Sequence, residues 1–296
     1  MATIKELDVS HLIGKKVGTS TILSELARGG MAIVFIAYQQ TLKRRIAVKI
    51  LPKKLVTPSK AELFQQEAEA AAFLSHPNII QILDIGEVDE FIYFTMQLIN
   101  GNPLNLLLKT AKKQVLPSKR FLPLAVTIKI ITQILDALEY AHQQDVIHRD
   151  IKPENIMIEK HTQRPIITDF GVAKVLKDAT EDNSIVRGSP LYMPPEQILG
   201  EVTDARSDIY AAGIMLFAML APQLPLPKFD SYDDLLKQKL LNKRGIFLKN
   251  PSQLNPHLNK VMDDIVLKAM AYEPEKRFVS CREFKNVIEL YQKKYL

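Results

Sequence analysis

Cysteine is almost absent from this chain of 296 residues, because Cys281 is the only one. A single cysteine excludes an internal disulfide and a cysteine-based metal cage, and it suits a reducing cytosol. Long apolar runs are also absent: the longest, 209–222, has 14 residues, whereas a membrane helix needs about 20. The N-terminus carries acidic residues and has no apolar core, which excludes a secretory signal. These absences predict a soluble, cytoplasmic protein in which 209–222 is a buried core helix.

The chain also lacks a concentrated basic patch, although its formal net charge is +6. The densest basic runs, 43–45 and 53–54, contain no interleaved aromatic residues. We therefore interpret the charge as a solvated basic surface and expect no nucleic-acid partner. The hydrophobic content of 47% is ordinary for a globular protein with an ample core.

The distribution of strand-like and helix-like patterns divides the chain in three. Residues 1–20 are a polar lead-in without an assignable pattern. Residues 21–98 contain several apolar runs typical of strands and one run of strong helix formers near 59–74, which predicts an antiparallel sheet of about five strands with one helix. Residues 99–296 show helical patterns joined by proline-containing loops. The fold class is therefore α+β, with a small sheet lobe, a larger mainly helical lobe and a ligand cleft between them.

The stretch 148–171, HRDIKPENIMIEKHTQRPIITDFG, concentrates the chemistry. Its two apolar runs, separated by HTQR, predict a tight hairpin, and the loops beside them carry Asp150, Lys152, Asn155 and Asp169. A carboxylate can orient a substrate hydroxyl, a lysine can neutralise a phosphoryl group, and two hard oxygen ligands suit magnesium. This combination predicts phosphoryl transfer.

The string H-R-D-x-K-x-x-N, with D-F-G beginning fourteen residues after Asn155, resembles the eukaryotic-type protein kinase family. The resemblance covers about 20–293, and its style is similar to bacterial members. It implies a bilobal protein kinase fold and a protein serine/threonine kinase that uses ATP and Mg²⁺, with Mn²⁺ as the alternative ion. It also implies protein substrates and autophosphorylation. Asp150 is then the base, Lys152 accompanies serine/threonine specificity, and Asn155 and Asp169 are the metal ligands.

A second cluster lies upstream. Lys49 ends the strand-like A-V-K and matches the lysine that holds the α- and β-phosphates in the family. A lysine between apolar neighbours needs a counter-charge. Glu67 is the favoured partner because it precedes His76 by nine residues, as in the family, and Glu69 is the alternative.

The phosphate loop departs from the family pattern G-x-G-x-x-G-x-V. Ala27 and Ala32 stand where glycines are expected, and Gly29 remains with Gly30 beside it. Since alanine is the least intrusive replacement for glycine, we expect a stiffer loop and a retained site. The resemblance implies this nucleotide-binding set: Leu26, Ala27, Gly29, Gly30, Ala32, Val34, Ala47, Lys49, Met96, Gln97, Ile99 and Met157.

Within that set, the resemblance implies that Val34 and Ala47 form the roof of the adenine pocket, Met157 its floor and Met96 its back wall. The backbone of Gln97 and Ile99 would then bind the purine. Taken singly, each apolar residue is equally well explained by core packing.

Residues 188–196, here called the platform segment, resemble the family segment G-T-x-x-Y-x-A-P-E that positions a peptide substrate. Ser189 replaces threonine, and Glu196 is expected to pair with Arg277 as a structural ion pair. Asp208 is expected to hold the catalytic loop by accepting backbone hydrogen bonds. The alternative for Asp208 is an ordinary acidic residue in a first helical turn, and both descriptions are compatible.

Regulation is predicted from Arg149, which lies beside the base and needs an acidic partner. A phosphate on Thr180 or Ser184 is one candidate partner. The alternative is that Glu181 or Asp182 already fills this role, which leaves the enzyme constitutively active.

Two other functions compete with a protein kinase. The loss of two glycines from the phosphate loop favours a pseudokinase that binds nucleotide as a scaffold. The presence of Lys49, Asp150, Asn155 and Asp169 argues against it. A small-molecule kinase of the aminoglycoside type is disfavoured by the platform segment and by Lys152. By resemblance to bacterial members, we also expect a homodimer through the small lobe. Many such members carry a membrane anchor after the kinase domain, so the chain is expected to be either cytosolic or a fragment of an anchored protein.

Overall fold

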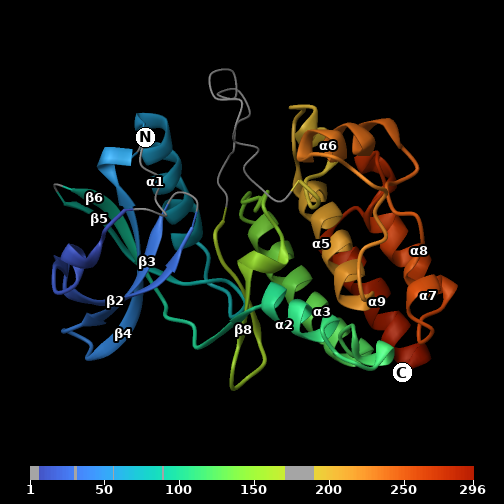
Figure 1. Cartoon of the computed structure of the whole chain (residues 1–296), viewed down its shortest axis with the longest axis horizontal. Helices are drawn as coiled ribbons and strands as arrows, with labels where there is room; N and C mark the ends of the chain where they lie inside the picture. The colour runs from blue at the N-terminus through green and yellow to red at the C-terminus, as the bar shows by residue number, and fades with distance from the viewer. Residues whose placement is uncertain (1–6, 30–31, 56, 89, 171–189) are drawn as a thin grey trace. The chain divides into compact units, whose positions relative to one another are not determined.

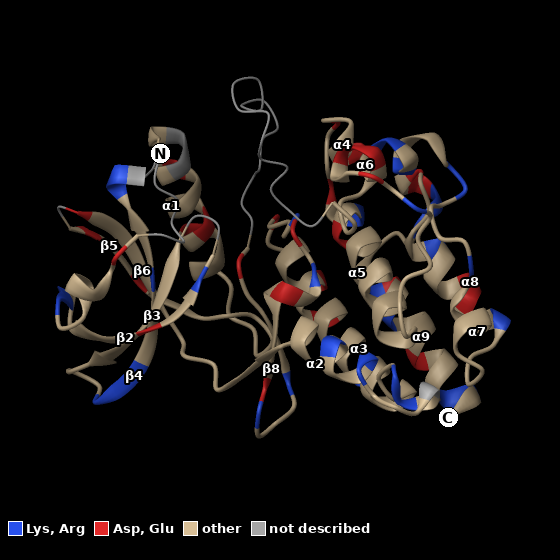
Figure 2. Cartoon of the chain, in the orientation of Figure 1, with Lys and Arg blue, Asp and Glu red and all other residues tan. Residues whose placement is uncertain are grey.

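The computed structural model divides the chain into two compact units, Met1–Asn100 and Gly101–Leu296. The residues that it describes are 7–29, 32–55, 57–88, 90–170 and 190–296 (Figure 1). Along both units, lysines and arginines are interspersed with aspartates and glutamates (Figure 2).

The first unit is built on an antiparallel sheet with the strand order β1-β2-β3-β4-β6-β5. Its strands are β1 (Lys16–Val17), β2 (Ser20–Arg28), β3 (Ile33–Gln39), β4 (Arg44–Pro52), β5 (Ile82–Val88) and β6 (Phe91–Met96). The sequence predicted about five strands. The described residues form six, and the additional one is the two-residue β1, which lies in the polar lead-in.

The lead-in packs onto this sheet through a few apolar side chains. Val9 and Leu12, the latter in the short 3₁₀ helix η2 (Ser10–Leu12), are each only 3% exposed and join the core cluster of the sheet. Arg28 donates from Nη1 to the Leu7 carbonyl oxygen at 2.7 Å. The sequence of this segment has no regular apolar period. Its conformation is determined by its contacts with the sheet.

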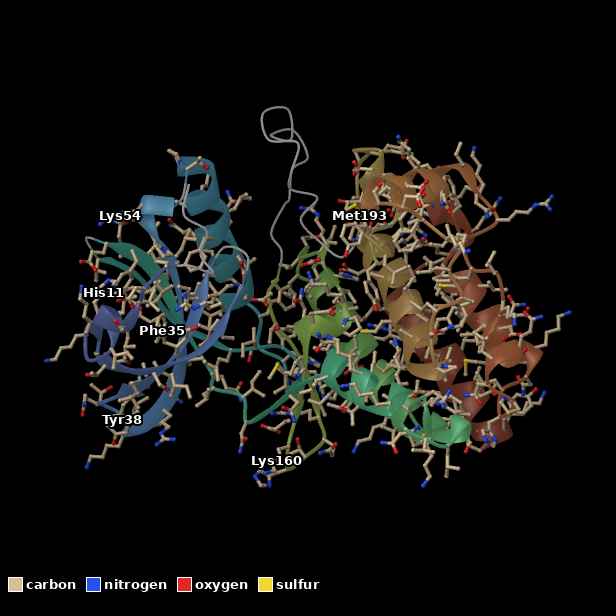
Figure 3. The ribbon with its side chains drawn as sticks, viewed as in Figure 1. His11, Phe35, Tyr38, Lys54, Lys160 and Met193 are labelled. Atoms are coloured by element: carbon tan, nitrogen blue, oxygen red, sulfur yellow. The ribbon has the colours of Figure 1, made fainter. Side chains whose placement is uncertain are left out.

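The two faces of the sheet bury different side chains. Phe35 on β3 is fully buried in the larger cluster, inside the first unit (Figure 3). On helix α1 (Pro58–Ala72), Phe64 and Ala68 stand one turn apart and pack with Phe94 of β6; the rings of Phe64 and Phe94 have centroids 4.9 Å apart. The i, i+4 spacing places both α1 side chains on one face of the helix. The single helix predicted near 59–74 is therefore confirmed.

The second unit is mainly helical. Its helices are α2 (Leu104–Lys112), α3 (Leu124–His142), α4 (Pro195–Ile198), α5 (Ala205–Leu220), α6 (Tyr232–Leu241), α7 (Pro251–Leu254), α8 (Lys260–Ala269) and α9 (Cys281–Tyr295). Every residue from 207 to 220 in α5 is buried, which confirms the predicted core helix, and α3 and α8 pack against it. Within the described ranges, no helix combines the length and the apolar character needed to cross a bilayer.

A small sheet in this unit carries the motif stretch. Its strands are β7 (Gly101–Pro103), β8 (Ile156–Glu159) and β9 (Pro165–Ile167), all antiparallel in the order β7-β8-β9. The predicted hairpin is confirmed as β8 and β9. The loop 148–155 leads into β8, and residues 168–170 follow β9, so the hairpin brings the two motif loops to the same end.

Candidate active site

The loop 148–155 places three of the predicted residues in direct contact. Lys152 donates from Nζ to Asp150 Oδ2 at 2.7 Å, and the two side chains are 17% and 16% exposed. Asn155 donates from Nδ2 to the Asp150 carbonyl oxygen at 2.8 Å and to its Oδ2 at 3.1 Å. The Asp150 carboxylate is therefore held in one orientation by an ammonium group and an amide.

Asp208, in the first turn of α5, anchors this loop to the core. Its Oδ2 accepts the backbone N–H of His148 at 2.9 Å, and its Oδ1 accepts that of Arg149 at 2.8 Å. Arg149 has φ +61°, a left-handed conformation that is costly for a long side chain. The two hydrogen bonds to one carboxylate stabilise that conformation. Both descriptions of Asp208 from the sequence therefore apply.

The charge of Asp208 is set by its surroundings. Burial alone would raise the pKa of this carboxyl, but the hydrogen bond and charge of His142, together with His148, hold it below its ordinary value. His142 Nε2 lies 2.8 Å from Asp208 Oδ2. Asp208 is consequently an ionised group in the protein interior.

His148 links the two motif loops as a neutral ring. Its Nδ1 accepts from the Asp150 N–H at 3.2 Å, so its Nε2 donates to the Thr168 carbonyl oxygen at 3.0 Å. Burial lowers the pKa of His148, against the opposing effect of Asp208. Its ring also packs on Phe170, with centroids 4.7 Å apart. The histidine of H-R-D thus connects Asp150 to the segment that begins D-F-G.

The predicted metal ligands fit a hard divalent ion. Thr168 donates from its N–H and its hydroxyl to the Asn155 carbonyl oxygen at 2.8 and 3.2 Å, which holds the neighbouring Asp169 next to this loop. Because Asn155 Nδ2 is bonded to Asp150, its amide oxygen is the atom suited to a metal. Asp169 is exposed and has φ +55°. Two oxygen ligands with room for water are typical of magnesium, and no cluster of three His, Cys, Asp or Glu suited to a metal occurs among the described residues.

In the first unit, Lys49 Nζ lies 2.6 Å from Glu67 Oε1 on α1. This is the partner that the sequence favours, while Glu69 accepts a hydrogen bond from Gln65 at 2.9 Å. Lys49 and Glu67 are 14% and 20% exposed. Lys49 Nζ also lies 5.4 Å from the centroid of the Phe94 ring, which adds a cation–π contact.

The strand register places several of the predicted nucleotide contacts on one face of the sheet. Val34 pairs with Lys49, and Ala47 pairs with Met96. Directly opposed residues project from the same face, as do Ala47 and Lys49 two positions apart. Val34, Ala47, Lys49 and Met96 therefore share the face that also carries Phe94.

Residues 30–31 of the phosphate loop lie outside the described residues, and Gly29 and Ala32 flank them. Gly29 donates its N–H to the Ala32 carbonyl oxygen at 2.9 Å, and a Cβ on Gly29 would meet that oxygen at 3.3 Å. The Ala32 methyl group is buried with Phe64, Ala68 and Phe94. Ala32 thus contributes to the core beneath α1, a role that the prediction of a stiffer loop did not include.

The other predicted nucleotide contacts are distributed over several elements. Leu26 and Ala27 lie on the exposed end of β2, and Gln97 donates its N–H to the Gln81 carbonyl oxygen at 2.9 Å. Ile99 is half-buried, and Met157 is half-buried on β8 of the second unit. Gly30 lies outside the described residues.

The Glu196–Arg277 pair is deeply buried, with side chains 5% and 0% exposed. Arg277 donates from Nη1 and Nη2 to the two carboxylate oxygens of Glu196, both at 2.7 Å. Its remaining N–H groups reach the carbonyl oxygens of Ala271, Arg206 and Tyr272. All five donors of the guanidinium are used, so the pair fastens α4 to the loop before α9.

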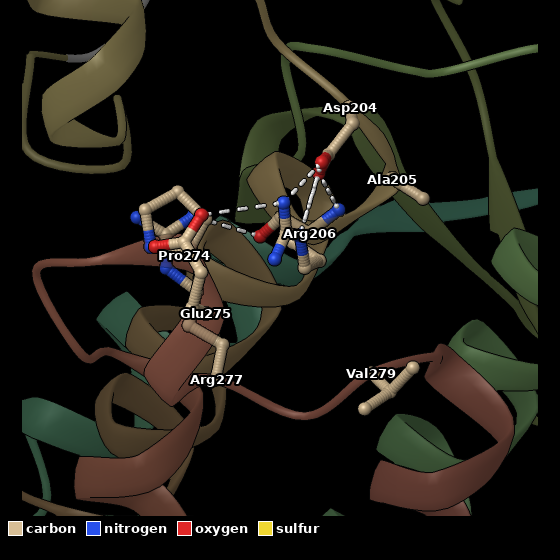
Figure 4. A pocket seen from close by; sticks show the side chains of 7 residues that line it. All are labelled: Asp204, Ala205, Arg206, Pro274, Glu275, Arg277 and Val279. Atoms are coloured by element: carbon tan, nitrogen blue, oxygen red, sulfur yellow. Dashed lines mark hydrogen bonds and ion pairs between the residues drawn. The ribbon is translucent and has the colours of Figure 1, made fainter.

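A pocket of about 270 Å³ lies beside this pair (Figure 4). It is lined by Asp204, Ala205, Arg206, Pro274, Glu275, Arg277 and Val279. Both arginines in its wall are already engaged, Arg206 by Asp204 at 2.7 Å and Arg277 by Glu196.

Several predicted regulatory residues, Thr180, Glu181, Asp182, Ser184 and Ser189, lie outside the described residues. Arg149 is described, and its Nε is buried without a hydrogen-bond partner in the described part of the chain.

One residue near the platform segment was missed by sequence reasoning. Lys239 on α6 is 2% exposed and donates to three backbone carbonyls of residues 190–193. The available signal was its position four residues after Leu235, the other buried residue of α6. This signal is weak, because Lys112 follows the buried Leu108 at the same spacing and is exposed.

With this geometry established, comparison with known sequences identifies the chain. The profile described as "Protein kinase domain" matches residues 20–292. The chain belongs to the protein kinase domain family, and the predicted α+β fold class, with its sheet lobe, single helix and larger helical lobe, is confirmed.

Curated proteins that are similar to this chain include kinases of bacteria. The serine/threonine-protein kinase PrkC of Bacillus subtilis is 35% identical over 94% of this chain and 41% of its own length. The tyrosine-protein kinase MasK of Myxococcus xanthus is 31% identical over 94% of this chain and 44% of its own. The chain thus spans about two fifths of the length of these relatives. Among solved structures, the kinase domain of Mycobacterium tuberculosis PknI matches with a TM-score of 0.71 and 26% identity, covering 94% of this chain and 98% of that one.

Proposed function

We propose that this chain is a protein serine/threonine kinase that transfers the γ-phosphate of ATP to hydroxyl groups of proteins, with Mg²⁺ as the metal ion. The observation that carries the proposal is the Asp150 carboxylate, oriented by Lys152 and Asn155 in a loop that Asp208 anchors. A carboxylate held this way can accept a hydrogen bond from a serine or threonine hydroxyl and align it for attack.

The other residues have roles that follow from their chemistry. The Lys152 ammonium group can turn from Asp150 toward the phosphoryl group and neutralise its charge during transfer. Asn155 and Asp169 would hold Mg²⁺, which neutralises charge on the phosphates when bound. Lys49, positioned by Glu67, would contact the α- and β-phosphates. The sheet face of Val34, Ala47 and Met96 would cover the adenine, with the backbone of Gln97 and Ile99 as hydrogen-bond partners. Met157 on β8 remains a predicted adenine contact.

A phosphate-transfer assay tests this directly. The purified chain is incubated with radiolabelled ATP, Mg²⁺ and dephosphorylated β-casein, beside an Asp150→Asn variant. Loss of the oriented carboxylate should lower the turnover by about 10²- to 10⁴-fold. The matched control is Asp264→Asn, an exposed carboxylate on α8, which should retain full activity. Equal labelling by wild type and Asp150→Asn would favour the nucleotide-binding scaffold, for which the alanines at 27 and 32 are the supporting feature.

The residue class of the acceptor is a separate outcome. PrkC and MasK carry names with different specificities, serine/threonine and tyrosine. Lys152 favours serine and threonine by resemblance. Mass-spectrometric mapping of the phosphorylated protein should therefore return phosphoserine and phosphothreonine, and a set dominated by phosphotyrosine would overturn this assignment. Replacing Mg²⁺ by Mn²⁺ in the same assay tests the choice of ion.

We also propose that the Arg149 guanidinium binds the phosphate group of a phosphorylated Thr180 or Ser184. The buried Nε of Arg149 supports this, because a buried donor favours an acceptor. Phosphatase treatment should then lower activity, whereas unchanged activity would favour Glu181 or Asp182 as the acidic partner.

We further propose a cytoplasmic location and a homodimer that forms through the first unit. Sedimentation of the purified chain tests the dimer.

A further inference from the structure

Helix α6 contains a buried charge that the reaction described above does not use. Lys239 is 2% exposed, and Leu235 is the only other buried residue described in this helix. Lysine is almost never fully buried unless its ammonium group is paired, because desolvation of the charge is costly. A buried lysine in a helix with only one other buried residue therefore indicates that its partners matter.

The partners of Lys239 are all in the platform segment. Its Nζ donates to the carbonyl oxygens of Leu191 at 2.8 Å, of Pro190 at 3.2 Å and of Met193. Met193 is labelled in Figure 3. An ammonium group has three N–H donors, so one side chain uses all of them on one short stretch of backbone. Residues 190–193 have no helix or strand of their own, which makes this side chain a main determinant of their path.

The surroundings of the ammonium complete the site. Nζ lies 5.0 Å from the centroid of the Tyr210 ring on α5, a cation–π contact. Burial lowers the pKa of Lys239 to about 7, with Glu196 on α4 opposing this effect and Arg277 adding to it. The platform segment is consequently fixed at two points, by the Glu196–Arg277 pair at its end and by Lys239 within it.

We propose that Lys239 is a positioning residue for protein substrates: it fixes the backbone path of residues 190–193, on which the acceptor peptide docks. This rests on the proposed function, because the peptide-docking role of the platform segment does. Lys239 acts through the backbone that it holds and touches neither the transferring phosphate nor the base. Its effect should therefore fall on the binding of the protein substrate and leave the handling of ATP unchanged.

The test separates the two substrates kinetically. Initial rates are measured with dephosphorylated β-casein at varied concentration and with ATP at varied concentration, and ATP hydrolysis is measured without casein. Lys239→Met removes all three donors, Lys239→Gln keeps an amide with two, and Lys239→Arg keeps the charge. The control is Lys237→Met, an exposed lysine two residues away on the same helix.

We expect Lys239→Met to raise the KM for casein at least tenfold, Lys239→Gln to raise it less, and Lys239→Arg to recover part of the loss. The KM for ATP and the casein-independent hydrolysis should stay within twofold of wild type, and Lys237→Met should behave as wild type. If Lys239→Met does not fold, as judged by circular dichroism, Lys239→Gln decides the question. A folded variant with an unchanged casein KM, or one that loses ATP hydrolysis in parallel, would overturn the inference while the proposed function stands. A wild-type chain that transfers no phosphate would overturn the proposed function, and the inference with it.

Discussion

Each unit of the molecule contains an ion pair between a glutamate and a basic residue, and the two pairs are built in opposite ways. Lys49 and Glu67 meet at 2.6 Å with side chains that remain 14% and 20% exposed. Glu196 and Arg277 share two bonds of 2.7 Å, are 5% and 0% exposed, and the arginine uses every donor. A partly exposed pair contributes little to stability and can reform, whereas a buried pair with no spare donors cannot lose a member without a large cost. The first pair is suited to positioning a ligand and the second to holding the fold.

The largest effect should come from breaking the buried pair. Glu196→Gln leaves the Arg277 guanidinium buried without its counter-charge, which should lower the free energy of unfolding by about 3–5 kcal/mol. Denaturant titration measures this change. Glu275→Gln, 74% exposed on the same surface, is the matched control and should change stability by less than about 0.5 kcal/mol. Similar values for both variants would remove the distinction between the two pairs.

The Lys49–Glu67 pair should show the reverse balance. Glu67→Gln should change the free energy of unfolding by less than about 1 kcal/mol. Because Lys49 then loses its fixed position, kcat/KM should fall by about 10²-fold. Glu69→Gln, two residues further along α1, should leave the rate unchanged. A stability loss as large as that of Glu196→Gln would show that the Lys49–Glu67 pair is structural.

Lys239 extends the comparison to a buried charge without a carboxylate contact. Its pKa is about 7 in the folded chain and has an ordinary value of 10.5. Between these pH values the unfolded chain binds more protons, so the stability of wild type should rise with pH relative to Lys239→Met. Denaturant titrations at about pH 7 and about pH 9.5, which lie inside this window, measure the difference between the two proteins at each pH. A constant difference would contradict this, and Lys237→Met should follow wild type at both values.

The smallest effect is expected in the phosphate loop. Ala32→Gly removes a buried methyl group from the cluster with Phe64 and Phe94 and adds backbone freedom, which together should cost about 1–2 kcal/mol. Ala27→Gly, at an exposed position of β2, should cost only the backbone contribution of about 0.5–1 kcal/mol. Thermal unfolding of the two variants compares them. Equal losses would show that the Ala32 methyl group does not contribute to packing.

Much of the fold was predictable because its signals are local. Helices α3 and α9 repeat apolar residues at the helical period, α1 is rich in strong helix formers, α5 is a continuous apolar run, and β8 and β9 are two short apolar runs joined by polar residues. The lead-in was not predictable, since Val9 and Leu12 acquire their place only from the sheet on which they pack. Strand β1, with two residues, is too short to show a period.

The site was predictable where chemistry and spacing coincide, and less so where partners are remote in sequence. Asp150, Lys152 and Asn155 lie within six residues, and their contacts follow from one loop. The choice of Glu67 over Glu69 depended on the resemblance to a family, because both residues lie in the same helix. The burial of Lys239 was not predictable, because its partners at 190–193 lie more than 45 residues earlier and no local pattern connects them.

The attachment of the loop 148–155 to α5 has a consequence for how such a chain can diverge. Asp208 holds that loop from a helix whose residues 207–220 are all buried. Substitutions on the outer surface of α8, which packs against α5, therefore reach the Asp150 loop through a closely packed core that resists displacement. Sequence drift at such exposed positions can proceed while the position of Asp150 is preserved. The loop 148–155 is therefore expected to keep its geometry while the exposed side of α8 changes.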